Sequence, residues 1–165
     1  MVILGIDPVI GRMGYGVIKI QDSRIMIQDF GCVETDAKSK IEMRLFQIHQ
    51  ELNKIMKEYK PDVLAIEELF FGANAKTALI VGQARGVVLL LAGQHNISLA
   101  VYTPLQVKIA LTGYGRAEKA QIGQMVKVLL KLPNIPKPDD TADALAVALT
   151  HAFSQKYGIL TSKKR

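Results

Sequence analysis

Four carboxylates stand where a folding chain usually avoids charge. Asp7 ends the apolar run VILGID, Glu67 lies near the end of DVLAIEEL, and Asp140 and Asp143 head the segment DDTADALAVAL. Burying an unpaired charge is costly, so acids at such positions need a partner. Residues three apart share one face of a helix, and neighbouring parallel strands form a ligand crevice at their carboxyl ends. We therefore expect the four side chains to meet in one place.

Carboxylates that meet repel one another, which raises the pKa of each. Divalent cations would neutralise them, and a set of ligands made only of oxygen favours Mg²⁺ or Mn²⁺. Two such ions, about 4 Å apart, are suited to the hydrolysis of a phosphodiester. The pattern is thus typical of a metal-dependent site acting on phosphodiesters.

Each acid also has an ordinary structural explanation. Asp139 or Asp140 could cap the last helix, whose first turn favours acidic residues, and Asp143 could lie on its solvated edge. Asp7 precedes a proline and could be a turn residue. Glu67 and Glu68 are neighbours on a predicted strand and point to opposite faces, so spacing alone does not choose between them.

Composition indicates one globular domain over residues 1–156, followed by a loose basic tail over 157–165. The chain has 165 residues, 49% of them hydrophobic, and a net charge of +6, which favours a polyanionic partner. The apolar run 86–93 is too short to cross a membrane, and the amino terminus has no signal-peptide pattern. A single cysteine, Cys32, fits a reducing, cytoplasmic location, and we expect it to be an inert core residue.

The order of apolar runs predicts an α/β protein with one mixed sheet. Short turns join the first three strands, which predicts an antiparallel meander. The expected strands cover residues 2–7, 14–21, 24–35, 62–69 and 98–104. The expected helices cover residues 38–59, 74–96, 104–112, 116–131 and 139–155.

Four motifs, in order over about residues 3–153, resemble those of the bacterial RuvC-type Holliday junction resolvases. They are LGIDP…GYGVI, IEELFF…N…ALIVGQARGVV, QVK…TGYGRAEKAQ and LPNIPKPDDTADALAVALTHA. The resemblance implies a ribonuclease H-like fold, with a mixed five-stranded sheet flanked by helices. It also implies a homodimeric, Mg²⁺-dependent endonuclease that resolves four-way DNA junctions by paired symmetric nicks in recombination and repair, with a branch-migration motor as a partner.

Carried over by motif, the resemblance implies that Asp7, Glu67, Asp140 and Asp143 are the catalytic, metal-binding set, and it selects Glu67 over Glu68. It implies two Mg²⁺ ions per site, for which Mn²⁺ can substitute. The chain departs from the family pattern in the turn after the first strand. Val9 replaces the usual glycine and Met13 the usual threonine, and these changes bear on substrate contacts more than on metal chemistry.

The candidates for DNA contacts are Phe70, Lys76, Arg85, Lys108, Arg116 and Lys119. Phe70 follows Glu67 closely, and an exposed ring there could stack on a base at the junction centre; core packing is the alternative. Lys108 and Lys119 flank a glycine-rich segment that allows close approach to phosphates, whereas the ordinary explanation is a solvated face. Lys76 and Arg85 are the weaker candidates.

Other functions are also compatible with parts of this pattern. One is a different ribonuclease H-like nuclease acting on branched DNA, and another is a junction-binding protein whose catalysis is weakened. A kinase-like ATPase of the actin class would need two such domains, for which this chain has no room. The chain also has no G-x-x-x-x-G-K-[ST] loop.

Overall fold

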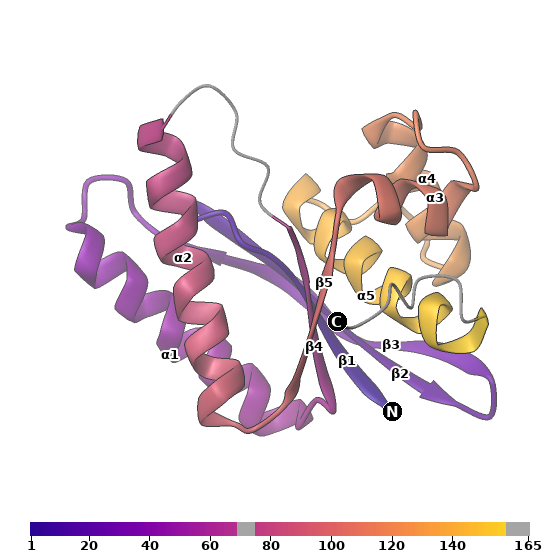
Figure 1. Ribbon diagram of the computed structural model, residues 1–165, viewed down its shortest axis with the longest axis horizontal. Coiled ribbons are helices and arrows are strands. Elements are labelled where there is room, and N and C mark those ends of the chain that lie inside the picture. The colour runs from indigo at the N-terminus through magenta and orange to yellow at the C-terminus, as the bar shows by residue number, and fades with distance from the viewer. Residues whose placement is uncertain (69–74, 158–165) are drawn as a thin grey trace, which may run out of the picture.

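The computed structural model describes residues 1–68 and 75–157, except for the side chains at 75, 76, 156 and 157. Helices cover both faces of a central sheet, with α1 and α2 on one face and α3, α4 and α5 on the other (Figure 1). The strands are β1 (Val2–Asp7), β2 (Arg12–Gln21), β3 (Arg24–Glu34), β4 (Val63–Glu67) and β5 (Ser98–Tyr102). The helices are α1 (Ile41–Tyr59), α2 (Ala75–Gln94), α3 (Pro104–Thr112), α4 (Lys119–Leu129) and α5 (Asp139–Tyr157).

The sheet is mixed, in the order β3-β2-β1-β4-β5. β1, β2 and β3 form the predicted antiparallel meander, and β4 and β5 run parallel to β1. The expected five-stranded mixed sheet is therefore confirmed. Three element starts differ from the expectation by two or three residues: β2 begins at Arg12 rather than at 14, α1 at Ile41 rather than at 38, and α4 at Lys119 rather than at 116.

Apolar side chains on the two faces of the sheet form two separate cores. On one face Leu4 and Ile6 of β1 pack among buried residues of α1 and α2. On the other face Ile3 of β1 packs among buried residues of α3, α4 and α5. Because β1 is covered on both faces, its sequence is a continuous apolar run instead of an alternating one.

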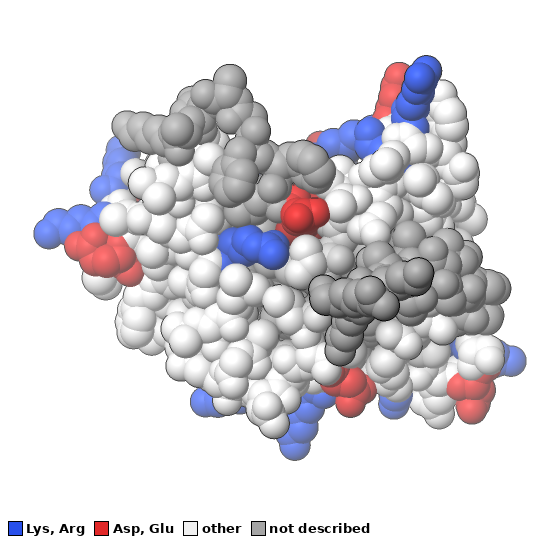
Figure 2. All heavy atoms as spheres, in the orientation of Figure 1, with Lys and Arg blue, Asp and Glu red and all other residues white. Residues whose placement is uncertain are grey.

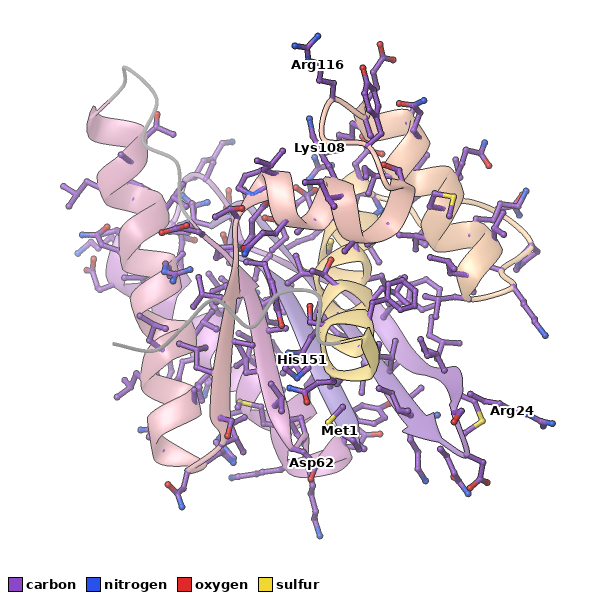
Figure 3. All side chains as sticks on the ribbon, turned by 45° about the vertical axis from the view of Figure 1, so that its right-hand side comes forward. Met1, Arg24, Asp62, Lys108, Arg116 and His151 are labelled. Carbon is purple, nitrogen blue, oxygen red and sulfur yellow. The ribbon has the colours of Figure 1, made fainter. Side chains whose placement is uncertain are left out.

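A buried polar contact joins β5 to α5. The Tyr102 hydroxyl lies 2.7 Å from Nδ1 of His151 in a hydrogen bond, and His151 is only 4% exposed. Figure 3 shows His151 between α5 and the strands. Burial lowers the pKa of His151 below its usual value of 6.5, because desolvation disfavours the charged ring. This contact helps to fix α5 over the parallel half of the sheet.

Glycines in β1 and β2 allow α5 to lie directly on the sheet. A side-chain carbon at Gly14 would overlap the backbone carbonyl of Asp140, and one at Gly5 would overlap the carbonyl of Ala144. On the helix side the contact is made by small residues such as Ala144 and Ala148, both 0% exposed. The GYG motif and the alanine-rich helix are thus two halves of one close backbone contact, which sets the position of the head of α5.

Helix α2 is 20 residues long, slightly shorter than the expected 74–96, and it is strongly apolar. The window Thr77–Gln94 has a mean hydropathy of 1.4, so by length and composition it could cross a membrane, which the shorter run considered above could not. Nevertheless Ala84, Val88 and Leu91 on this helix are each 0% exposed within the core shared with β1 and α1. We interpret α2 as a packing helix of the globular fold, as its position against α1 in Figure 1 indicates.

The contact between α5 and the sheet predicts a large penalty for a methyl group at Gly14. We expect Gly14→Ala to lower the free energy of unfolding by about 1–3 kcal/mol, because the backbone of α5 must move. Chemical denaturation of the protein measures this change.

Gly93→Ala is the matched control, since Gly93 lies in α2 with nothing within 4 Å of the added carbon. In a helix, alanine instead of glycine should stabilise the protein by about 0.5–1 kcal/mol. Equal effects of the two substitutions would contradict the close-contact interpretation.

Candidate active site

The four acids lie at one end of the sheet. Asp7 is the last residue of β1 and Glu67 the last of β4, and these strands are parallel neighbours with Ile6 opposite Ile66. Asp140 and Asp143 lie in the first turns of α5, which the contact at Gly14 holds against the adjacent strand β2. The structure therefore brings together all four acids that the sequence singled out.

The strongest electrostatic effect of this arrangement falls on Asp7. The pKa of Asp7 is raised from 3.8 to about 7, first by burial and then by the charges of Asp143, Glu67 and Asp140 in that order, against an opposing effect of Lys119. Burial and neighbouring like charges both disfavour an ionised carboxylate. A proton on Asp7 near neutral pH thus relieves part of the repulsion in the site.

The pKa values of Glu67 and Asp143 are also raised. Burial, followed by the charge of Asp143, raises the pKa of Glu67. Burial also raises the pKa of Asp143, although the hydrogen bond and charge of Lys119 oppose this. Perturbed carboxylates gathered at one end of a sheet are characteristic of functional sites.

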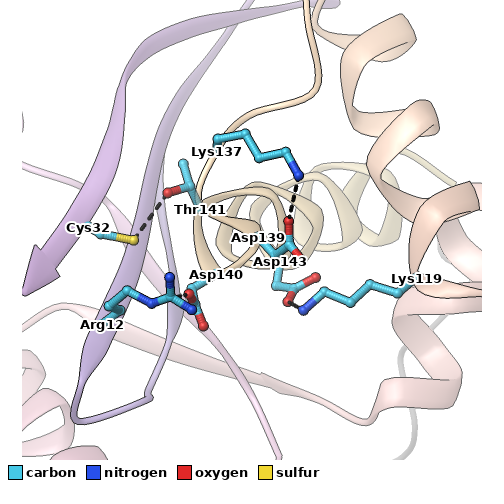
Figure 4. Close-up of polar contacts among 8 residues, drawn as sticks. All are labelled: Arg12, Cys32, Lys119, Lys137, Asp139, Asp140, Thr141 and Asp143. Atoms are coloured by element: carbon cyan, nitrogen blue, oxygen red, sulfur yellow. Dashed lines mark hydrogen bonds and ion pairs between the residues drawn. The ribbon is translucent and has the colours of Figure 1, made fainter.

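Two exposed bases reach into the cluster (Figure 4). Lys119 Nζ lies 2.7 Å from Asp143 Oδ2, and Arg12 Nε lies 3.2 Å from Asp140 Oδ2. Lys119 is the first residue of α4, whose start is capped by a hydrogen bond of 2.8 Å from the Glu118 N–H to Gln121 Oε1. The hydrogen bond to Asp143 raises the pKa of Lys119, so this base stays charged.

The donor set fits a hard divalent cation. It consists of carboxylate oxygens, which Mg²⁺ and Mn²⁺ prefer. Oδ2 of Asp140 is also buried and accepts no hydrogen bond from any described residue, and such a buried orphan atom needs an explanation. As they stand, however, no three acidic, histidine or cysteine side chains among residues 1–68 and 75–157 are arranged to hold one ion together. Lys119 contacts one oxygen of Asp143, and Arg12 contacts one oxygen of Asp140.

A small hollow adjoins the acids. It has a volume of about 150 Å³; Glu67, Asp143, Lys108 and Lys119 line its polar side, and Val107 is among its apolar residues. This hollow gives solvent and ligands a route to the acids.

Lys108 and Arg116, two of the basic residues proposed from the sequence, lie at one end of the molecule. Figure 3 shows them at the end opposite to Met1 and Asp62. β1 runs from Val2 near that far end to Asp7, so the two bases lie at the end where the acids gather. Lys108 is half-buried and Arg116 is exposed. This end of the molecule therefore combines the acids with the bases expected to contact DNA.

The remaining candidates have different outcomes. The Arg85 guanidinium donates a hydrogen bond of 2.7 Å from Nη1 to the backbone carbonyl of Glu67, so in this structure it connects α2 to the end of β4. Phe70 lies outside the described residues, as does the side chain of Lys76. Glu68 is exposed whereas Glu67 is half-buried, which agrees with the selection of Glu67.

Two features of the site were not anticipated. Arg12, the first residue of β2 and two positions before the GYG motif, was overlooked, because local spacing gave no signal for it. Cys32 is half-buried rather than a core residue, because it lies on edge strand β3. Its Sγ lies 3.2 Å from Oγ1 of Thr141, which directly follows Asp140 on α5. The expectation of a buried, inert cysteine was thus wrong about its burial.

The family model described as crossover junction endodeoxyribonuclease RuvC matches residues 3–151 of the chain. The chain belongs to the RuvC family. It is 53% identical to a RuvC from Alkaliphilus oremlandii over 95% of this chain and 96% of that protein. It is 50% identical to a RuvC from Ruminiclostridium cellulolyticum over 100% of this chain and 99% of that protein.

A solved RuvC structure gives the same result for the fold. The structure of Thermus thermophilus RuvC in complex with a Holliday junction substrate has a TM-score of 0.88 and 34% identity, covering 96% of this chain and 97% of that chain. The expected ribonuclease H-like fold is thereby confirmed. The two departures from the RuvC pattern differ in their surroundings: Val9 is 37% exposed and its N–H donates a hydrogen bond of 2.9 Å to the carbonyl of Asp7, whereas Met13 is 0% exposed within the core shared with α1 and α2.

The raised pKa of Asp7 predicts how stability depends on pH in the metal-free protein. Between the unfolded value of 3.8 and the folded value of about 7, the folded chain holds a proton that the unfolded chain has released. The contribution of Asp7 to the free energy of unfolding therefore falls as pH rises through this window. We expect Asp7→Asn, measured with a chelator, to stabilise the protein by up to about 2 kcal/mol near pH 8 and to give no gain near pH 4.

Thermal unfolding at both pH values measures this effect. Glu51→Gln is the control, because Glu51 pairs with Lys54 on α1, a helix that carries none of the four acids. A gain for Asp7→Asn that does not change with pH would show that repulsion among the acids is not its cause.

Proposed function

We propose that this chain is a Mg²⁺-dependent endonuclease that resolves four-way DNA junctions by paired symmetric nicks, in bacterial cytoplasmic recombination and repair. Membership of the RuvC family supports the activity. The structural observation on which the proposal rests is that four carboxylates lie together. Asp143, Glu67 and Asp140 are close enough to raise the pKa of the fourth, Asp7. A buried cluster of this kind is unfavourable for the stability of the metal-free chain, and for that reason it indicates a functional site.

In this proposal Asp7, Glu67, Asp140 and Asp143 hold two Mg²⁺ ions, for which Mn²⁺ can substitute. The ions, when bound, activate water and stabilise charge on the scissile phosphate. Asp7 lies at the centre of the acids, where the other three carboxylates act on it, so it is suited to contact both ions. Glu67 comes from β4, and Asp140 and Asp143 come from α5, so the four carboxylates would hold the ions from three separate elements.

The bases at this end of the molecule would hold the DNA backbone. Lys108 borders the hollow beside Glu67, where an ammonium can pair with a phosphate next to the one that is cut. Arg116 is exposed in the segment just before α4, which suits a contact farther along the strand. By its place in the family motif, Phe70 remains our candidate for stacking at the junction centre.

A homodimer would match the two-fold character of a four-way junction and present two sites to two strands. The support lies on α2 and the edge strand β5, where large apolar side chains are exposed. Leu79 is 65% exposed and Leu90 56% on α2, and Leu99 and Val101 are each 41% exposed on β5. Figure 2 shows a mainly uncharged surface over these elements. Extended apolar surface of this kind marks protein interfaces. A branch-migration motor would act as a further partner.

Removing one carboxylate should abolish cleavage and preserve binding. We expect Glu67→Gln to nick a synthetic four-way junction at least about 100-fold more slowly with Mg²⁺, because metal-based charge stabilisation is worth several kcal/mol. Its junction affinity with Ca²⁺ should stay within about threefold, because phosphate contacts supply most of the binding free energy. Single-turnover cleavage and a gel-shift titration measure the two quantities.

Glu68→Gln is the matched control, since Glu68 is the next residue and is exposed; it should cut normally. A linear duplex of the same sequence should be cut far more slowly than the junction by the native protein. Equal cleavage of the two DNAs would favour a general nuclease over a resolvase, and normal cutting by Glu67→Gln would refute the assignment of the acids.

The dimer proposal is tested by placing a charge on α2. Leu90→Glu should weaken self-association at least about tenfold, because a carboxylate cannot be buried at an apolar interface without a partner. Sedimentation velocity at micromolar concentration measures it. Val128→Glu is the control, because Val128 is 64% exposed on α4, which covers the other face of the sheet. A native protein that is monomeric without DNA would contradict the proposal.

A further inference from the structure

Two bases and two acids of the site form a matched pair of contacts. In each, an exposed base reaches inward to a much less exposed acid. The side chain of Lys119 is 61% exposed and that of Asp143 is 27%, and the corresponding values for Arg12 and Asp140 are 55% and 13%. Figure 4 shows Lys119 and Arg12 approaching the head of α5 from opposite sides. The bases therefore come from solvent to the acids, whereas the acids are held by the fold.

The geometry of these two contacts differs from that of a well-formed structural ion pair, in which both carboxylate oxygens are engaged. The Arg12 contact joins Nε and Oδ2 at 3.2 Å, yet that same oxygen accepts no hydrogen bond from the described residues. The Lys119 contact is short, at 2.7 Å, but involves a single oxygen. Only the base of each pair is exposed, so the base can return to water, and a bound cation would take its place beside the acid.

The same contacts involve carboxylate oxygens that a metal ion could use. No three acidic, histidine or cysteine side chains in the described parts of the chain could hold one ion as they stand. Oδ2 of Asp143 faces the ammonium of Lys119, and Oδ2 of Asp140 faces the guanidinium of Arg12. A cation that bound Oδ2 of Asp143 or of Asp140 would take over an oxygen that a base now contacts.

We propose that Lys119 and Arg12 are exchangeable counter-cations, which leave Asp143 and Asp140 when divalent metal binds and then become available to DNA phosphates. This inference rests on the proposed function as a metal-dependent nuclease. It goes further by coupling metal loading to DNA binding through two named side chains. The released ammonium of Lys119 would remain beside the hollow that Lys108 also lines. Two positive groups would then face a phosphate beside the loaded acids.

The coupling has a direct consequence for metal affinity without DNA. Metal must compete with Lys119 for Asp143, so removing the base should strengthen metal binding. We expect Lys119→Gln to bind Mn²⁺ about three- to tenfold more tightly than the native protein, because the metal no longer displaces an ion pair. Isothermal titration calorimetry of the DNA-free protein with Mn²⁺ alone measures this.

Lys108→Gln is the matched control for charge at a distance. Lys108 acts on Glu67 through its charge and borders the same hollow, but no ion pair joins it to an acid among the described residues. Its removal should tighten Mn²⁺ binding by less than about twofold. Equal gains for the two variants, or no gain for Lys119→Gln, would overturn the exchange, since only a general charge effect would then remain.

A second measurement follows the base itself. In NMR spectra of the lysine Nζ groups, the Lys119 signal, identified by its loss in Lys119→Gln, should change when Mg²⁺ is added, whereas that of Lys54 should not. Lys54 is a suitable reference because it pairs with Glu51 on α1 at 2.7 Å, far from the site in sequence. A Lys119 signal that stays unchanged in saturating Mg²⁺ would overturn the proposal.

Junction-binding measurements test the second part of the proposal, that the released bases contact DNA phosphates. Ca²⁺ should strengthen junction binding by the native protein, and this gain should be at least about threefold smaller in Lys119→Gln. Failure of the proposed function would look different, because the native protein would then bind no metal and cut no junction. Metal binding and cutting by a protein whose Lys119 signal never changes would refute the exchange alone.

Discussion

The contact between the backbone of α5 and the glycines of β1 and β2 is the constraint on which the site depends. At Gly5 and Gly14 the helix lies so close to the sheet that a single added carbon would overlap a carbonyl oxygen. This contact brings the first turns of α5 beside the ends of β1 and β4, which carry the other two acids. Packing of backbone against backbone therefore performs here what a metal-binding loop performs in many other sites. The apolar cores on both faces of the sheet supply the stability that this close placement requires.

That placement holds the four carboxylates close together although their negative charges repel one another. Buried among like charges, Asp7 has a pKa of about 7, which is a measure of how unfavourable the cluster is without a cation. Lys119 and Arg12 partly neutralise it from solvent. Their long, mobile side chains suit temporary neutralisation better than permanent structure, because little ordering is lost when they leave. The cluster thus stores electrostatic strain, which bound cations would relieve.

Much of this could be predicted from the sequence, for identifiable reasons. The strands of the meander followed from apolar runs and short turns, and the placement of Asp7 and Glu67 followed from their positions at strand ends. The choice of Glu67 over Glu68 needed the family resemblance, because neighbours on a strand differ only in the face they occupy. Arg12 and the half-buried state of Cys32 could not be predicted this way. Both depend on which strand lies at the edge of the sheet and on how closely α5 approaches it, and neither of these is encoded in local spacing.

The hydrogen bond from Arg85 to the last carbonyl of β4 links two parts of the molecule that have separate tasks. Arg85 belongs to α2, which carries exposed leucines, and the peptide that it holds also carries Glu67. A small rotation of α2 would therefore be transmitted through the rigid guanidinium to the peptide that carries the Glu67 carboxylate. In a dimer joined through α2, each proposed active site would be connected mechanically to the interface between the two subunits. Such a connection offers a physical basis for synchronised cutting of two strands.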